Sequence, residues 1–272
     1  MKLSKLTFKT KRVDIEQGSG LGKYLAFYFY IDGKEIGKEE YNPADYDDIL
    51  ASDKDMIFIQ HCGCGKRGCS ALVANVKSVS TDVVEWSINE YRYDAGAEEY
   101  HFAKAEYEKT MAQVYNEAYL EGVEQNSSRY SYILKMEPED SFSVFWNEEG
   151  TCIGNAEHIS LKNDTYNLKF AELQKWADSY MWQVLVPSES GEITLEEIGK
   201  TFDWKSFHKQ GIALAVEVKK LLPKDVVLKY STPFEDRSGI FPNEVLIDDD
   251  EWYVRNVLEK IVNFIPGENY GQ

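Results

Sequence analysis

The sequence is poor in the residues that cross-link, break or catalyse. Its 272 residues include four cysteines, seven prolines and four histidines. No run approaches the ~20 apolar residues of a membrane-spanning helix, and the first ten residues lack the apolar stretch of a signal peptide. We therefore expect a cytoplasmic protein without membrane contact. Its cysteines should be thiols or metal ligands rather than disulfides.

Catalytic motifs are also missing from the sequence. It contains neither the Gly-x-Ser-x-Gly turn of serine hydrolases nor the His-Glu-x-x-His pair of zinc proteases. No histidine is recognisably paired with a nucleophile and an orienting group, as nucleophilic catalysis requires. We therefore expect a protein that is not an enzyme.

Aromatic residues and acidic charge are abundant. Apolar residues make up 43% and aromatic residues 14% of the chain, enough to build folded cores. The net charge is −17. It is uneven, because residues 137–272 carry 13 basic and 25 acidic groups, net −12, against −5 for residues 1–136. Such a field repels nucleic acid and favours basic partners; the plain alternative is that it keeps the protein soluble.

The N-terminal half is patterned mainly for strands. Two segments are aromatic or apolar runs that favour strands, two later segments alternate apolar and polar residues, and Asp32-Gly33 predicts a hairpin turn after the first. Asn42-Pro43 predicts the start of a short helix over 44–50. A longer helix is expected over 104–121. The strand segments are 24–31, 56–59, 71–79 and 82–91, and the longer helix should bury Tyr107, Met111, Val114, Tyr115 and Ala118.

The C-terminal half is patterned mainly for helices. The clearest spans 204–222, because Asp203 is a suitable N-cap, Phe202 can pack onto Phe207 across it, and Pro223 ends it. Further helices are expected over 168–181 and behind Asp249. The residues of the 204–222 helix that should face inward are Phe207, Gly211, Leu214, Ala215, Val218 and Leu222.

Strands that cluster early and helices that cluster late favour an α+β fold, with an antiparallel, strand-rich N-terminal half and a helix-rich mixed C-terminal half. Polar residues at 122–129 and a break at Glu137-Pro138-Glu139-Asp140 indicate two domains that meet near 122–140. We assign 1–136 to a strand-rich domain and 137–272 to an acidic α+β domain. One continuous domain with a shared sheet is the alternative.

A glycine-rich loop carries three cysteines and a histidine within nine residues. His61, Cys62, Cys64 and Cys69 form a candidate zinc set, in which Cys152 could replace His61. The spacing argues against zinc: one residue separates Cys62 from Cys64, where paired ligands usually have about two to four. Adjacent His61 and Cys62 would also point to opposite sides of an extended backbone. We therefore expect a structural turn and no cofactor, with a zinc-dependent module or enzyme organised by residues 62–69 as the alternative.

Carboxylates cluster at two places in the acidic half. The run 248–251 lacks the spacing of a calcium loop, and one or two of its members suffice to cap the last helix and favour its dipole. The remaining carboxylates and the negative net charge of this half lead us to predict a surface that binds a basic protein. Its predicted partner-binding residues are Glu235, Asp236, Asp248, Asp249 and Glu251.

Part of the N-terminal half resembles a group of uncharacterised bacterial proteins. In that group a Cys-x-Cys-Gly-x-x-Gly-Cys loop precedes a Val-x-Trp strand and a Phe…Tyr segment, and the likeness covers about residues 56–110. Some proteins of this sort look like immunity partners of polymorphic toxins, which implies partner binding and supplies no active-site residues. The matching residues are Cys62, Cys64, Cys69, Val84, Trp86, Phe102 and Tyr107.

These observations lead us to expect a non-catalytic bacterial binding protein, an immunity or antitoxin-like inhibitor that occludes a basic toxin. An acidic inhibitor gains fast association with a cationic partner. The alternatives are the metal-dependent module or enzyme and a housekeeping protein without a special ligand. We expect no nucleic-acid partner.

Overall fold

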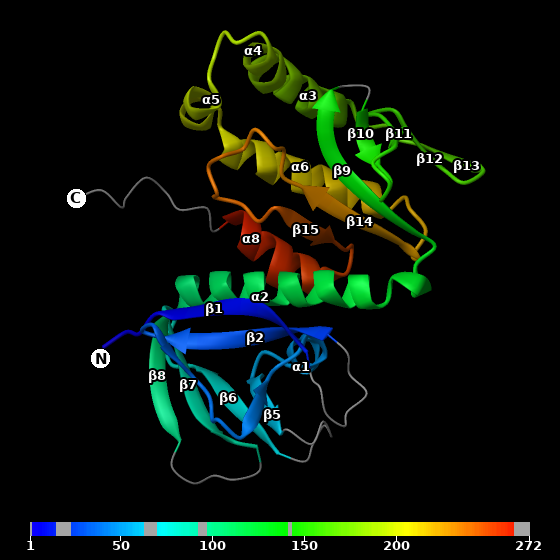
Figure 1. The fold of residues 1–272 in the computed structure, drawn as a ribbon. Helices are drawn as coiled ribbons and strands as arrows, with labels where there is room; N and C mark the ends of the chain where they lie inside the picture. The colour runs from blue at the N-terminus through cyan, green and yellow to red at the C-terminus, as the bar shows by residue number, and fades with distance from the viewer. Residues whose placement is uncertain (1, 15–22, 63–69, 92–96, 141–142, 264–272) are drawn as a thin grey trace. The chain divides into compact units, whose positions relative to one another are not determined.

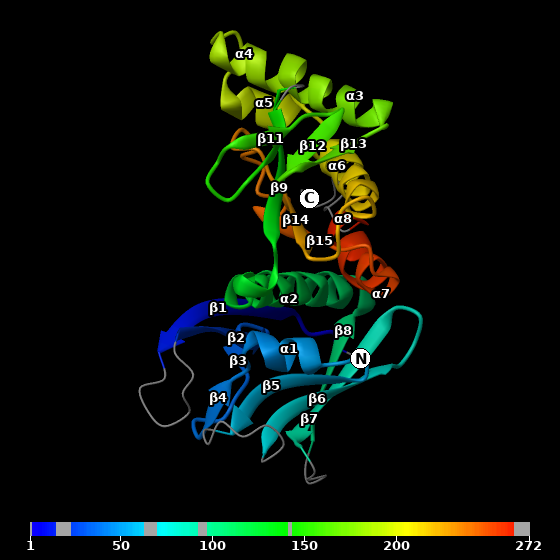
Figure 2. The same cartoon turned by 90° about the vertical axis from the view of Figure 1, so that its right-hand side faces the viewer.

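The computed structural model describes residues 2–14, 23–62, 70–91, 97–140 and 143–263 (Figures 1 and 2). The chain divides into two compact units, Met1–Gln125 (unit 1) and Asn126–Gln272 (unit 2). The fold is α+β, as predicted, with antiparallel sheets in the N-terminal half and most helices in the C-terminal half. Within the described residues, no helix is long and apolar enough to cross a membrane.

The two units meet earlier in the sequence than the predicted boundary at 136/137. Strand β9 (Tyr132–Asp140) explains the difference, because it pairs with β10 (Ser143–Trp146) and with β14 (Val226–Ser231) in the sheet of unit 2. The break predicted at Glu137-Pro138-Glu139-Asp140 is therefore part of a strand.

Unit 1 contains two antiparallel sheets with strand orders β1-β2-β3 and β4-β5-β6-β7-β8. Asp32 and Gly33 have φ angles of 51° and 80°, which confirms the predicted hairpin turn. Isolated bridges from Ser4 to Phe102 and from Phe27 to Ala44 link the two sheets. The strands are β1 (Leu6–Asp14), β2 (Lys23–Ile31), β3 (Lys34–Glu35), β4 (Tyr41–Pro43), β5 (Met56–Cys62), β6 (Ala71–Ser78), β7 (Val83–Glu90) and β8 (Glu98–Ala103).

Two helices, α1 (Tyr46–Ala51) and α2 (Lys104–Gln125), complete unit 1. All five side chains predicted to form the inner face of α2 are buried. The helix runs on past Glu121 into the stretch predicted as a linker. Gly122 lies where α2 packs against Tyr46 and Leu50 of α1.

An aromatic cluster forms part of the core of unit 1. Trp86 is fully buried, and its ring centroid lies 6.0 Å from that of Phe29, 5.5 Å from Phe102 and 5.9 Å from Tyr107. Val84 is buried on the same strand. The strand and helix residues that carry the family resemblance are therefore core residues, whose spacing reflects packing.

Unit 2 contains a seven-stranded sheet of order β13-β12-β11-β10-β9-β14-β15. Its neighbouring strands pair antiparallel except β9 and β14, which run parallel with Leu134 opposite Leu228. Leu134 and Met136 of β9 are fully buried, and Lys135 between them points to the opposite face. The remaining strands are β11 (Cys152–Gly154), β12 (His158–Leu161), β13 (Asp164–Asn167) and β15 (Glu244–Ile247).

Helix α6 (Trp204–Lys219) packs against β14 and β15 (Figure 1). It begins as predicted, since the Asp203 carboxylate accepts the Ser206 N–H at 3.0 Å and the rings of Phe202 and Phe207 lie 5.4 Å apart. The predicted inner face is wrong at one position: Leu214 is only half-buried, and Ile212 is buried instead. The other helical segments are η1 (Ser127–Arg129), α3 (Ala171–Tyr180), the π-helix η2 (Met181–Leu185), α4 (Val186–Glu189), α5 (Leu195–Thr201), α7 (Glu251–Tyr253), the π-helix η3 (Val254–Leu258) and α8 (Glu259–Asn263).

Candidate functional site

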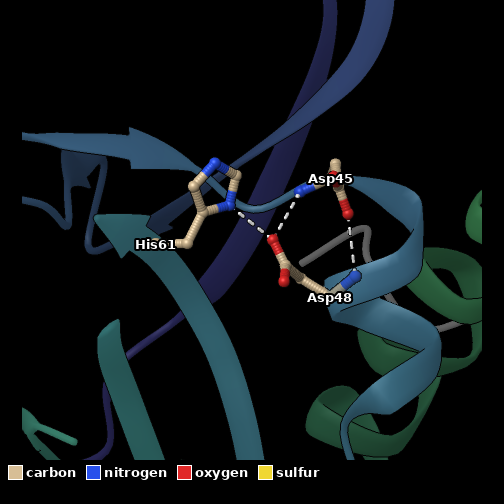
Figure 3. Close-up of side chains that lie close together, drawn as sticks. All are labelled: Asp45, Asp48 and His61. Carbon is tan, nitrogen blue, oxygen red and sulfur yellow. Dashed lines mark hydrogen bonds and ion pairs between the residues drawn. The ribbon is translucent and has the colours of Figure 1, made fainter. Parts of the chain in front are cut away.

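The first cluster of potential ligands lies in unit 1 and joins α1 to β5 (Figure 3). Asp45 caps α1: its carboxylate accepts the Asp48 N–H at 2.8 Å, and the Asp48 carboxylate accepts the Asp45 N–H at 3.2 Å. His61, from β5, places Nδ1 2.5 Å from Oδ2 of Asp48. The short helix predicted over 44–50 is confirmed as α1, but it begins behind Asp45 rather than at Asn42-Pro43, because those two residues belong to β4 and pair with β5.

The geometry of this cluster fits a hydrogen-bonded link better than a metal site. The potential ligand atoms of Asp45, Asp48 and His61 lie within 4.8 Å of one another. Two ligands of one tetrahedral zinc, however, lie roughly 3.4 Å apart when each bond is about 2.1 Å. The contact of 2.5 Å between His61 and Asp48 is shorter than that, and the same Asp48 oxygen already accepts a backbone N–H. These residues therefore fasten α1 to the sheet.

The predicted zinc set is only partly described. Cys64 and Cys69 lie outside the described residues, so their positions relative to His61 are not assigned. Cys62 is half-buried at the end of β5. His61 contacts Asp48, a residue that the predicted set did not include. Cys152 lies on β11 of unit 2 and is exposed.

We expect protein purified without added metal to contain far less than one zinc per chain. The reason is that Asp48 already binds His61 and the start of α1. Elemental mass spectrometry of a native preparation is the test, and about one zinc per chain would contradict the prediction. In that event, loss of zinc in Asp48→Asn would place the metal at the Asp45–Asp48–His61 cluster. Loss of zinc in Cys62→Ser alone would place it in the cysteine loop.

The second candidate is an open cavity in unit 2 with a volume of about 630 Å³. Alternate residues of β9, namely Ile133, Lys135 and Glu137, form one wall, on the face opposite Leu134 and Met136. Six glutamates and two lysines line the cavity, so its charged groups are mainly negative. The lining residues are Ile133, Lys135, Glu137, Pro138, Glu139, Trp146, Asn147, Glu148, Gly150, Tyr180, Leu185, Glu189, Lys229, Phe234, Glu235 and Glu244.

The two lysines of the cavity neutralise only part of its charge. Lys135 lies 2.6 Å from the Glu137 carboxylate, and Lys229 lies 3.8 Å from that of Glu244. Within the described residues, three further lining glutamates have no ion-pair partner. Those three exposed side chains are Glu139, Glu148 and Glu189. The cavity therefore presents carboxylates that can pair with a cationic ligand.

The pKa of the Tyr180 hydroxyl is raised by its burial and by the carboxylates of the cavity. Burial raises the pKa of its hydroxyl well above the usual range. The hydrogen bond to the Glu235 carboxylate and the charges of Glu137 and Glu139 raise that pKa further. A neutral hydroxyl donor is therefore held against the cavity wall, and it fixes the position of Glu235.

Asp236 points away from the cavity into the interior of unit 2. Its Oδ2 lies 2.8 Å from His208 Nε2, while His208 Nδ1 lies 2.8 Å from the Tyr230 hydroxyl. The Asp236 and His208 side chains are each 1% exposed. Burial tends to raise the pKa of Asp236, but hydrogen bonds from His208 and Ser238 outweigh that effect and the pKa is lowered. Although we predicted Asp236 to touch a partner, a buried carboxylate cannot do so, and we remove it from the predicted surface.

The acidic run 248–251 lies outside the cavity lining. Asp250, not Asp249, caps α7, and its carboxylate accepts the Tyr253 N–H at 3.0 Å. Burial lowers the pKa of Lys219, and the charges of Asp249 and Asp248 oppose that shift. These carboxylates therefore have a local role, which is to start a helix and to offset a buried ammonium group.

Of the predicted partner-binding residues, only Glu235 lines the cavity. Sequence reasoning missed Glu137, Glu139, Glu148, Glu189 and Glu244. The sequence did offer one signal for them. Residues 132–140 form a strand, and the alternation of side chains along a strand places Lys135 and Glu137 on one face.

The chain matches no family model, and no curated protein or solved structure is detectably similar to it. The resemblance to uncharacterised bacterial proteins therefore stays a prediction.

Proposed function

We propose that this chain is a non-catalytic cytoplasmic binding protein whose unit 2 binds a basic partner protein, in the manner of an immunity or antitoxin-like inhibitor. One observation carries the proposal: six glutamates converge from β9, β15, helix α4 and two connecting segments on one cavity, with two lysines among them. A concave site of one charge sign concentrates ligands of the opposite sign and speeds their association.

The cavity also contains apolar surface, which favours a protein partner over a simple counter-ion. Trp146, Leu185 and Phe234 line it together with the glutamates. Protein interfaces combine aromatic residues at the centre with charges at the rim. Trp182, in the same π-helix as Leu185, is 63% exposed. A basic side chain flanked by apolar residues would match this combination.

We expect the change of Glu139, Glu148 and Glu189 to glutamine to slow association with a basic ligand about tenfold at low salt. The probe is an immobilised arginine-rich peptide, and the measurement is its association rate against ionic strength. The effect should shrink as the Debye length falls from ~10 Å at 0.1 M to ~3 Å at 1 M salt.

The matched control removes three charges from the acidic run 248–251, with Asp248→Asn, Asp249→Asn and Glu251→Gln. It should slow association less than the cavity variant does. Equal effects of the two triple variants, or no dependence on salt, would contradict binding in the cavity. An inhibitor role also predicts a basic-toxin gene beside this gene, and the same variants test that role in cells that express the toxin. The wild type and the control variant should restore growth, and the cavity variant should not.

A further inference from the structure

Phe234 is the most exposed large apolar side chain in the described part of the chain, at 68%. It lies on the loop between β14 and β15 and lines the acidic cavity. An aromatic ring left in water beside a concave acidic wall is characteristic of a residue that contacts a partner.

Hydrogen bonds of the two residues that follow Phe234 fix the position of its loop. Glu235 accepts a hydrogen bond from the Tyr180 hydroxyl, and Asp236 is paired with the buried His208. The Asp236 N–H also donates to the Pro233 carbonyl at 3.0 Å, and the Ser238 N–H donates to Asp236 Oδ1 at 2.8 Å. The ring is therefore presented from a fixed backbone, so a ligand that binds it has little loop entropy to remove.

The ring of Phe234 already stacks with one guanidinium group. Cζ of Arg237 lies 3.9 Å from the ring centroid, within the range of a cation–π contact. Because the side chain is still 68% exposed, the opposite face of the ring is open. A planar cation stacked on that face would lie at the wall of a cavity lined by glutamates.

We propose that Phe234 and the cavity glutamates bind an arginine side chain of the basic partner, with its guanidinium stacked on the open face of the ring and paired with carboxylates. The inference rests on the proposed function and adds the type of residue that the partner presents. Arginine fits better than lysine, because its guanidinium is planar, weakly hydrated and able to pair with carboxylates at two positions. A lysine ammonium group satisfies the charge alone.

The test uses the full chain and two soluble peptides that are identical except that every arginine in one is lysine in the other. Fluorescence anisotropy at one fixed ionic strength gives both dissociation constants. The wild type should bind the arginine peptide about threefold to fivefold more tightly. Phe234→Ala and Phe234→Leu should remove this preference while the affinity for the lysine peptide changes less than about twofold. Trp252→Ala, which alters another exposed aromatic residue of unit 2, should keep the preference.

Each contrary result has a distinct meaning. If the wild type binds both peptides equally, or if Phe234→Ala keeps the preference, the arginine site is refuted while the proposed function stands. If Phe234→Leu alone keeps the preference, the contact is apolar and the stacking is refuted. If neither peptide binds the wild type, the proposed function itself fails. If the wild type forms dimers and Phe234→Ala is monomeric, a second copy of the chain is the occupant and the inference is also refuted.

Discussion

Replacing Gly211 with alanine should lower the free energy of unfolding of unit 2 by about 2–3 kcal/mol. Gly211 lies on the inner face of α6, where an added Cβ atom would lie 2.6 Å from Cε2 of Tyr230 and 2.8 Å from Cζ2 of Trp176. Both rings are fully buried, so relieving the overlap requires core side chains to shift. The gain in helix propensity from glycine to alanine, about 1 kcal/mol, is too small to offset this overlap.

Gly199→Ala is the matched control for this prediction. Gly199 also lies in a helix of unit 2, but a Cβ atom there meets no heavy atom within 4 Å. The control should raise stability by about 0.5–1 kcal/mol, because alanine favours helix and restricts the unfolded chain. Denaturant unfolding of both variants is the measurement. Similar stabilities for the two would mean that α6 does not pack on Tyr230 and Trp176 as described.

Replacing Asp236 with alanine should cost unit 2 about 3–5 kcal/mol, because it removes one member of a buried pair and leaves His208 without its carboxylate. His208 is buried among aromatic rings, with centroid distances of 5.7 Å to Trp204 and 4.7 Å to Phe241. Asp236→Asn keeps a hydrogen-bond acceptor and should cost less. Thermal unfolding of Asp236→Ala within a few degrees of the wild type would contradict the buried pair.

The same pair predicts how stability depends on pH. The pKa of Asp236 is lowered in the folded protein, so its ionised form adds stability above the ordinary carboxyl pKa of about 3.9. That contribution is lost as the pH falls through the lowered pKa of the folded state. The wild type should therefore lose its advantage over Asp236→Asn below about pH 4. An advantage that stays constant from pH 7 to pH 3 would contradict a titrating Asp236.

Local signals in the sequence were sufficient to predict the elements that local physics determines. Helix α6 has an N-cap at Asp203 and a hydrophobic contact across the cap, and both are confirmed. The hairpin at Asp32-Gly33 and the buried face of α2 are confirmed for the same reason, since turn residues and helical spacing act over a few positions.

The site could not be predicted, because it depends on contacts between distant residues. Strand β9 pairs in parallel with β14, although most of the sequence of unit 2 lies between the two strands. This pairing places Lys135 beside Lys229. Residues 137–140 were predicted to be a break between domains, because proline is rare in a strand outside a sheet edge and three acidic residues accompany it here. His208 and Asp236 are 28 residues apart, and nothing in their local sequence indicates that they pair.

The indole signals of the protein test most directly whether the cavity of unit 2 binds a basic ligand. The chain has six tryptophans. Trp146 lines the cavity, and its indole N–H donates to the Glu137 carbonyl at 2.9 Å. Trp86 lies in the core of unit 1, and Trp252 lies in α7 beside the other acidic cluster.

The measurement is a titration of ¹⁵N-labelled protein with the arginine-rich peptide, followed by the shifts of the assigned indole N–H signals. We predict a saturable shift of the Trp146 signal, which the Glu139, Glu148 and Glu189 to glutamine variant weakens, while the Trp86 and Trp252 signals stay in place. Saturable binding that shifts Trp252 and leaves Trp146 unchanged would contradict the account.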